Sequence, residues 1–344
     1  MNDDKTMKVL VRSRPTRLNN QETFTIDDDC VKINNRTYTF DKVLDGESTN
    51  DDLTNVIMHR LKQSIGRYNT TLFAYGASGS GKTYNCKLII KSIINALPKD
   101  LSFSFYEIYN EKAYDLISQS LIPLKVRESI DIGFYLEGLT CQQTSTHEDF
   151  MKYYTWLSKN RKCCKTALNP NSSRSHSILI IYYNGVKMTL VDLAGSEKTS
   201  KSGVTGSTLV ETNNINKSLL SFSRVIEMLV NDPKSHSIPF RETLVTKLLS
   251  QSLIGNAMTT FLVCINQSTD ASVTENTLKF ANNIKKLKTK PKEILLKKPV
   301  LTRHRAIDID IKPIVVYRNV DLDAIQNINE SVKLNLLRLL KPKH

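Results

Sequence analysis

The stretch Gly76-Ala77-Ser78-Gly79-Ser80-Gly81-Lys82-Thr83 decides the fold of this 344-residue chain. It matches the pattern G-x-x-x-x-G-K-[ST] without a mismatch. The five residues before it, TLFAY at 71–75, are apolar, β-branched or aromatic and predict a buried strand. After it, apolar residues recur at helical spacing from Cys86 until Pro98 interrupts the pattern. A strand, a glycine loop and a helix in this order predict a phosphate-binding loop.

Each part of that loop suits the binding of a nucleotide. The glycines let backbone N–H groups turn toward phosphates, and the start of the helix adds a positive dipole end. Lys82 is expected to reach the β- and γ-phosphates of ATP, and the Thr83 hydroxyl is expected to ligate Mg²⁺. The alternative is a glycine- and serine-rich turn that matches by chance. Because the flanking strand and helix are also in place, nucleotide binding is the better interpretation.

A second stretch, TLVDLAGSE at residues 189–197, supports the same chemistry. A hydrophobic strand that ends in Asp192 is typical of phosphate-loop ATPases, in which the aspartate holds a Mg²⁺-bound water. Gly195 has no side chain, so its N–H group can approach a γ-phosphate closely. The two stretches together are much stronger evidence than either alone.

Strands and helices alternate along most of the chain, which predicts an α/β fold. We expect a three-layer sandwich in which a central, largely parallel mixed sheet carries helices on both faces. The expected strands lie at residues 8–12, 24–26, 31–33, 36–40, 71–75, 101–109, 177–183, 189–192 and 259–265. The expected helices lie at residues 51–66, 84–97, 148–165, 213–229, 242–253 and 274–287.

The composition indicates an acidic binding partner but does not decide which kind of molecule it is. The formal charge of +14 predicts an acidic partner, for which nucleic acid, an anionic membrane and an acidic protein polymer all qualify. No apolar run reaches about 18 residues, and the N-terminus lacks a signal-peptide core, so we expect no membrane span. The six cysteines are scattered without a C-x-x-C pair, which favours a reducing compartment over a disulfide framework or a zinc site.

Several stretches together resemble the kinesin motor domain, over about Lys8 to Pro291. They are RSRP at 12–15, the phosphate loop, NPNSSRSH at 169–176, DLAGSE at 192–197, NINKSL at 214–219 and PFRE at 239–242 followed by KLL at 247–249. In that family, 169–176 and 192–197 are the first and second switch, and 214–219 opens the helix that faces the microtubule. The resemblance implies a motor domain over residues 1–287.

The resemblance also implies roles for individual residues, with ATP and Mg²⁺ as cofactors. The adenine is expected along Arg12, Arg14 and Pro15. Ser172 and Ser173 are expected near the γ-phosphate, with Ser173 joining Thr83 and Asp192 around Mg²⁺. Arg174 and Glu197 are expected to pair across the switches and position the attacking water, with Gly195 as the γ-phosphate sensor.

The function implied is that of a microtubule-stimulated ATPase motor, associated with the cytoskeleton in the cytoplasm. With the motor ahead of the segment that follows it, movement is expected toward the plus end. A nucleotide-insensitive microtubule tether is one alternative, and a nucleic-acid-binding phosphate-loop ATPase is a less favoured one. Candidates for contact with tubulin are Lys198, Lys201, Lys234, His236, Arg241 and Lys247.

Three features depart from the family pattern. Ala77 and Ser78 replace the Gln-Thr pair at the rim of the loop. Leu53 is expected to take the place of an aromatic residue or histidine against the adenine. The helix after Thr83 runs to Pro98 without the insertion that is common in kinesins, because the next strand begins near Leu101.

The C-terminal part of the sequence predicts two further segments. Residues 288–306 are basic and resemble a neck linker, although Glu293 and Ile294 replace the Val-Asn type of latch. Residues 307–344 form a short extension in which isoleucines alternate like a strand at 307–311. An apolar helix stripe follows at Leu322, Ile325, Ile328, Val332, Leu336, Leu337, Leu339 and Leu340. At about two heptads this stripe is short for a coiled coil, so docking on the motor, a cargo adaptor or a second chain are all open.

Overall fold

The computed structural model describes residues 7–15, 23–130, 132–159, 161, 174–197, 207–235, 237–287 and 291–294. The chain divides into two compact units, residues 1–296 and 297–344, and every described residue belongs to the first. The strand predicted at 307–311 and the apolar helix stripe that starts at Leu322 therefore lie outside the described residues.

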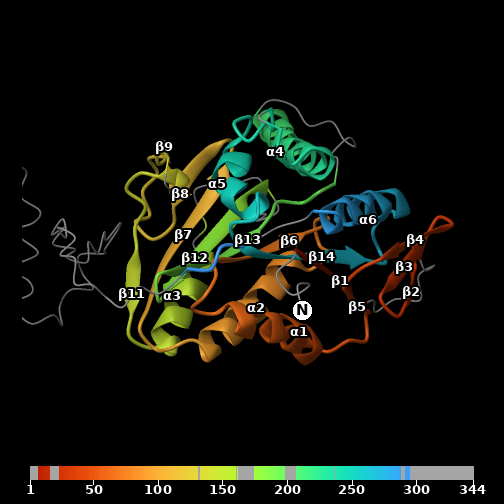
Figure 1. Ribbon diagram of the computed structural model, residues 1–344, viewed down its shortest axis with the longest axis horizontal. Helices are drawn as coiled ribbons and strands as arrows, with labels where there is room; N and C mark the ends of the chain where they lie inside the picture. Colours follow the sequence, from red (N-terminus) through yellow and green to blue (C-terminus); the bar gives the residue numbers. More distant parts are fainter. Residues whose placement is uncertain are drawn as a thin grey trace, which may run out of the picture. The chain divides into compact units, whose positions relative to one another are not determined.

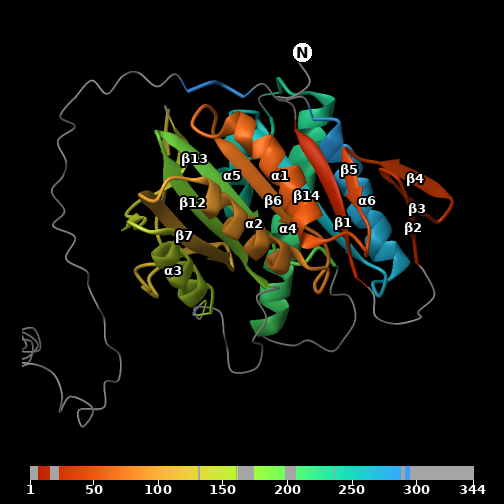
Figure 2. The ribbon, with the colours of Figure 1, turned by 90° about the horizontal axis from the view of Figure 1, so that it is seen from below.

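A nine-stranded sheet forms the centre of the first unit (Figures 1 and 2). Its strand order is β11-β7-β12-β13-β6-β14-β1-β5, and β8 pairs with β7 outside this path. The strands are β1 (Lys8–Arg14), β5 (Lys42–Leu44), β6 (Thr70–Tyr75), β7 (Leu101–Tyr109), β8 (Lys112–Asp115), β11 (Gln142–Thr144), β12 (His176–Tyr183), β13 (Val186–Asp192) and β14 (Met258–Asn266).

The sheet is mixed, and its parallel pairs lie in one half. β6 runs parallel to both β13 and β14, and β1 runs parallel to β14 and β5. In the other half, β7 pairs antiparallel with β8, β11 and β12, and β12 pairs antiparallel with β13. Because parallel strands end at the same edge, the carboxyl ends of β1, β6, β13 and β14 form one side of the sheet. Ligands of open α/β sheets bind at such an edge.

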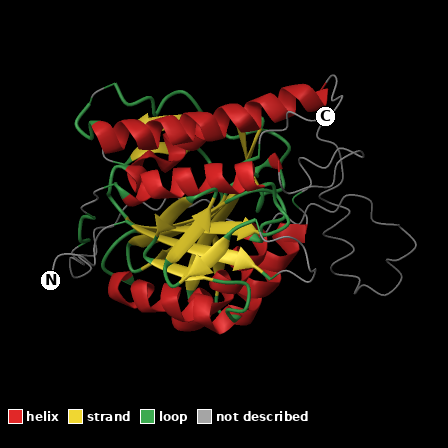
Figure 3. Cartoon of the chain, turned by 90° about the vertical axis from the view of Figure 1, so that its right-hand side faces the viewer, coloured by secondary structure: helices red, strands yellow, loops and turns green. Residues whose placement is uncertain are grey.

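Helices cover both faces of the sheet, as predicted (Figure 3). They are α1 (Asn50–Ser64), α2 (Lys82–Ala96), α3 (His147–Lys159), α4 (Ser207–Asn231), α5 (Leu244–Leu253) and α6 (Ala271–Lys285). Residues of α1, α2 and α3 share one hydrophobic cluster with the sheet, and residues of α4, α5 and α6 share another. Thr49 begins α1 with a capping box, because its side chain accepts from the Asp52 amide and the Asp52 carboxylate accepts from the Thr49 amide.

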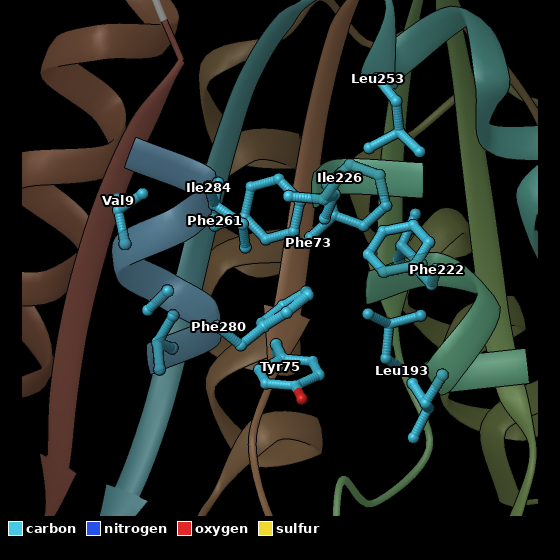
Figure 4. Packing of buried hydrophobic residues seen from close by; sticks show 14 of the residues in the cluster. Val9, Phe73, Tyr75, Leu193, Phe222, Ile226, Leu253, Phe261, Phe280 and Ile284 are labelled. Atoms are coloured by element: carbon cyan, nitrogen blue, oxygen red, sulfur yellow. The ribbon is translucent and has the colours of Figure 1, made fainter. Parts of the chain in front are cut away.

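The central strands are buried on both sides, which is why they read as nearly continuous apolar runs. In β6, Leu72 belongs to the cluster with α2, and its neighbour Phe73 belongs to the opposite cluster. Phe73 stacks on Phe261 of β14 with ring centroids 4.4 Å apart, and Phe222 of α4 packs on it at 5.7 Å (Figure 4). All three rings are fully buried, and burial of such a side chain stabilises the fold by about 1.5–3 kcal/mol.

Two small sheets flank the central one. The predicted strands at 24–26, 31–33 and 36–40 correspond to β2 (Thr25–Asp27), β3 (Cys30–Ile33) and β4 (Arg36–Thr39). Asn34 and Asn35 join β3 to β4 with φ angles of 47° and 59°, which suits asparagine in a tight hairpin. The second small sheet is a hairpin of β9 (Val126–Ser129) and β10 (Gly133–Leu136), which the sequence did not predict. Its strands have only four residues each and a single buried side chain, Leu136, so no clear alternation of apolar residues marks them.

The helix boundaries differ most from the predicted ones at two places. α4 begins at Ser207, six positions before the expected start at 213, and α3 ends at Lys159, so that Arg161 is not helical. The connection behind the phosphate loop is as short as predicted, since α2 is uninterrupted and β7 begins at Leu101. None of the helices in the described ranges is long and apolar enough to cross a membrane.

Candidate active site

The phosphate loop joins the end of β6 to the start of α2. Gly76 has φ = 147°, and a Cβ atom there would overlap the carbonyl oxygen of Cys264 on the neighbouring strand β14. Gly81 stands at the N-cap of α2 with φ = 102°. Lys82 is 6% exposed, and its Nζ donates to the carbonyl oxygens of Gly76 and Ala77 at 2.9 Å each. The loop thus wraps around its own lysine, as a phosphate cradle requires.

Thr83 and Asp192 meet beside this cradle. The Thr83 hydroxyl donates to Asp192 Oδ2 at 2.6 Å, since parallel pairing of β6 with β13 brings the two strand ends together. Asp192 Oδ1 and Ser80 Oγ are buried and have no hydrogen-bond partner among the described residues. A hydroxyl and an aspartate with a spare oxygen are the kind of ligands that Mg²⁺ takes beside a phosphate. The residues present therefore fit a Mg²⁺–nucleotide complex.

The second switch lies directly on the phosphate loop. The Ser196 amide donates to the Gly76 carbonyl oxygen at 3.1 Å, and Glu197 Oε2 accepts from the Ser78 amide at 2.8 Å. A Cβ atom on Gly195 would collide with Ser78 Oγ and with the Glu197 carboxylate. Gly195 is thus held close to the rim of the loop, where its predicted role as a γ-phosphate sensor would place it.

The first switch is described only at its C-terminal end. Ser172 and Ser173 lie outside the described residues, and the pairing of Arg174 with Glu197 stays a prediction. Ser175 donates to the buried Glu107 of β7, and the Arg161 guanidinium contacts that carboxylate at 3.3 Å. Arg161 also lies 4.0 Å from Asp192 Oδ2. Glu107 and Arg161 were not predicted from the sequence, because a buried ion pair between distant segments has no local pattern.

His176 follows Ser175 and is buried between three elements. Its Nδ1 accepts from the Ala194 amide at 3.1 Å, and its Nε2 lies 2.9 Å from Ser218 Oγ of α4. Burial, together with the nearby positive charges of Arg161 and Lys82, lowers the pKa of His176 to about 3. The imidazole is therefore neutral at physiological pH.

The three residues predicted along the adenine, Arg12, Arg14 and Pro15, are all described. Arg12 is 5% exposed, and its guanidinium donates to Asn85 Oδ1 at 2.7 Å and to Asn50 Oδ1 at 2.8 Å. It therefore braces the starts of α1 and α2 from within, and direct contact with the adenine stays a prediction. Arg14 donates to the Gly79 carbonyl oxygen at 2.6 Å, and Pro15 is exposed beside it. Arg14 thus lies against the phosphate loop, and contact of Arg14 and Pro15 with the adenine stays a prediction.

The expectation for Leu53 was wrong. Leu53 is fully buried and packs in the hydrophobic cluster between α1, α2 and the sheet, so it cannot line an adenine surface. The physical reason is the phase of α1, whose inward face carries Leu53, Ile57 and Leu61. An aromatic side chain does stand at this corner, since Tyr84 is 56% exposed and its hydroxyl accepts from Asn50 Nδ2 at 2.9 Å.

The candidate tubulin contacts are only partly described. Lys198, Lys201 and His236 lie outside the described residues, while Lys234 is exposed and Lys247 is half-buried. Arg241 forms a bidentate pair with Glu128 at 2.7 and 2.9 Å, and its guanidinium lies 5.6 Å from the Phe134 ring centroid. It thus ties the segment before α5 to the β9–β10 hairpin.

Comparison with known proteins gives one family. The model of the kinesin motor domain matches residues 2–287. Kinesin heavy chain of Drosophila melanogaster is 34% identical over 295 residues, an alignment that covers 76% of this chain and 30% of that protein. Kinesin-like protein KIF18A of Mus musculus is 36% identical over 295 residues, which cover 75% of this chain and 33% of that protein. The chain thus spans about a third of the length of these relatives.

Solved structures agree with the sequence relatives. The structure of a fast kinesin superposes with a TM-score of 0.74 at 29% identity and covers 90% of this chain and 99% of that one. A KIF14 dimer with AMP-PNP in complex with a microtubule gives a TM-score of 0.71 at 27% identity, over 83% of this chain and 95% of that one. Since the family match, the relatives and the fold agree over the same part of the sequence, this chain belongs to the kinesin motor-domain family.

Proposed function

We propose that this chain is a microtubule-stimulated ATPase that converts ATP hydrolysis into movement along microtubules. The observation that carries the proposal is the contact of the second switch with the phosphate loop, through Ser196 to Gly76 and Glu197 to Ser78. From that switch the chain continues into α4, so a change at the γ-phosphate has a short covalent path to a long surface helix. Motors of this kind need such a path between two sites.

Hydrolysis would rest on positioning and charge stabilisation, without a covalent protein intermediate. Lys82 supplies a fixed positive charge inside the cradle, and the loop amides orient the phosphates. Mg²⁺ held by Thr83, Asp192 and the predicted ligand Ser173 would neutralise negative charge on the phosphates. Arg174 and Glu197 are proposed to close over the nucleotide and orient the attacking water, which requires Glu197 to leave the Ser78 amide.

The proposed tubulin surface is the face that carries α4 and α5. The KIF14 relative was solved in complex with a microtubule, and the same partner is proposed here. Lys198, Lys201, Lys234, His236 and Lys247 are the proposed contacts. Arg241 would have to exchange Glu128 for an acidic group of tubulin, so its net contribution is expected to be smaller.

The segment after α6 is proposed to transmit force. The Ile294 amide donates to the Arg67 carbonyl oxygen at 2.7 Å, and Arg67 pairs with Glu293 at 2.8 Å. Movement toward the plus end and a location on microtubules in the cytoplasm are proposed from family membership. The apolar stripe from Leu322 is proposed to bind a cargo adaptor or a second chain.

Steady-state ATPase assays test the proposal directly. Turnover should rise with microtubules and should not rise with DNA. Stimulation by DNA alone would support the nucleic-acid-binding alternative, and microtubule binding without turnover would support the tether. Gliding assays on polarity-marked microtubules then decide the direction of movement, and minus-end motion would contradict that part of the proposal.

A further inference from the structure

One buried imidazole connects both switches to α4. His176 is 3% exposed, is the last residue of the first switch and begins β12. Its Nδ1 faces the amide of Ala194, the residue before Gly195 of the second switch. Its Nε2 faces Ser218, which is 2% exposed on α4. The side chain of His176 therefore links the first switch to the second switch and to α4.

The three hydrogen bonds around this ring fix its tautomer. Because an amide can only donate, Nδ1 must be the unprotonated nitrogen. The hydrogen of the neutral ring is then on Nε2 and is donated to Ser218 Oγ, while the Ser218 hydroxyl donates to the Ile215 carbonyl oxygen at 2.7 Å. Each of the three donors, the Ala194 amide, His176 Nε2 and the Ser218 hydroxyl, has one acceptor, so these hydrogen bonds need no water. The lowered pKa of His176 agrees with a ring that stays neutral.

We propose that His176 is a positioning residue that couples the second switch to α4, through the relay Ala194 N–H to His176 to Ser218. The inference rests on the proposed function and names the contact by which a shift of Gly195 would reach the helix. When Gly195 moves toward or away from the phosphates, the Ala194 amide moves with it. The rigid ring carries that displacement to Ser218, half-way along α4, independently of the loop 198–206 that joins the two in sequence.

The alternative is a histidine that only fills the core, and the two interpretations differ in what a variant changes. Loss of a packing residue lowers stability and all activities together. Loss of the relay should lower stimulation by microtubules and spare the turnover measured without them. Ser218→Ala is the sharpest probe, because Ser218 is too buried to touch tubulin and lies outside the nucleotide site.

Ser223→Ala is a matched control on the same helix. The Ser223 hydroxyl also donates to a backbone carbonyl of α4, that of Leu219 at 2.9 Å, but it forms no hydrogen bond with the described residues of either switch. We expect Ser218→Ala to keep basal turnover within about twofold and to lose about fivefold or more of the microtubule stimulation, a typical size for coupling between sites. Ser223→Ala should keep both, and thermal unfolding of each variant monitors folding.

His176 variants test each half of the relay. His176→Asn can keep an acceptor near the Ala194 amide, and His176→Gln can keep a donor near Ser218. Each change keeps only one half of the relay, so both should reduce stimulation. The double variant His176→Asn, Ser218→Ala should be no worse than the worse single one, because both remove the same relay. Additive losses would overturn the relay, as would undiminished stimulation in folded Ser218→Ala. If the unaltered chain is not stimulated by microtubules, the proposed function itself fails, which a separate measurement on that chain reveals.

Discussion

The backbone of Gly76 has φ = 147°, which residues other than glycine rarely adopt. A Cβ atom added at this position would also overlap the carbonyl oxygen of Cys264. Gly76→Ala should therefore lower the free energy of unfolding by at least about 1–3 kcal/mol, from backbone strain alone. Urea denaturation measures the change. Gly185→Ala is the control, because Gly185 also has a positive φ of 73° but its Cβ atom would meet nothing within 4 Å. An equal loss in both variants would show that the close strand contact is not the cause.

Glu197 has a present partner and a proposed one. It accepts from the Ser78 amide at 2.8 Å, and it is proposed to pair with Arg174 when ATP is bound. Glu197→Ala should reduce turnover by about a hundredfold or more, comparable to the loss of one preorganised catalytic contact, while microtubule co-sedimentation with ATP persists. Glu197→Gln keeps the side-chain size and is the matched control for charge. Normal turnover in the alanine variant would sink the proposed switch pair.

The neutral state of His176 predicts how stability depends on pH. Its pKa is about 3 in the folded protein and about 6.5 when unfolded, because burial and the charges of Arg161 and Lys82 disfavour the imidazolium. Below pH about 6.5 the unfolded chain binds a proton that the folded chain does not, so folding stability falls as the pH is lowered. Urea denaturation between pH 7 and 5 should show a shallower slope for His176→Asn than for the unaltered chain. Equal slopes would contradict the buried, neutral assignment.

At the scale of elements, the ion pair Arg67–Glu293 accompanies the hydrogen bond from the Ile294 amide to the Arg67 carbonyl oxygen. Both partners are well exposed, with 63% and 39% of their side-chain surface accessible, so the pair should contribute no more than about 1 kcal/mol. Glu293→Arg should accelerate hydrogen exchange of the Ile294 amide by up to about fivefold, since that amide donates to the Arg67 carbonyl.

The exchange experiment has its own charge control. The swapped variant Arg67→Glu, Glu293→Arg should restore most of the protection of Ile294, because the two charges again attract. If the Ile294 amide exchanges as fast in the swapped variant as in Glu293→Arg, the backbone hydrogen bond to residue 67, and not the charge pair, holds residues 293–294 in place. Raising the salt concentration should mimic Glu293→Arg in the unaltered chain, since exposed pairs are screened.

The helices and strands also differ in how well the local sequence predicts them. The local sequence pattern predicts β6, α2 and β14, because each contains an apolar run or an apolar helix stripe that is buried in the structure. The β9–β10 hairpin does not, since its position depends on contacts such as Arg241 with Glu128 and Phe134, more than a hundred residues apart. The early start of α4 at Ser207 is also hard to predict, because only the adjacent Leu209 and Val210 are apolar ahead of Ile215, which is too few for a helical stripe.

For the whole molecule, the charge of +14 predicts strong salt dependence of microtubule binding. Between about 25 and 200 mM salt the affinity for microtubules should fall by at least about tenfold, because exposed charges are screened over that range. Basal ATP turnover should change far less, since Lys82 is buried in its loop. Co-sedimentation and ATPase assays in the same buffers make the comparison, and a salt-independent affinity would exclude an electrostatic interface.

By itself the sequence determined the phosphate loop, its strand and helix, the α/β layers and the family, because glycine spacing and apolar periodicity are local constraints that act wherever the chain lies. Only the tertiary structure decided which side chains meet. It put Leu53 in the core rather than at the adenine, because the phase of α1 is set by what it packs against. It also decided that Arg12 forms hydrogen bonds with Asn85 and Asn50, and that His176 forms hydrogen bonds with Ala194 and Ser218. Such contacts depend on strand order and helix placement, which no short stretch of sequence encodes.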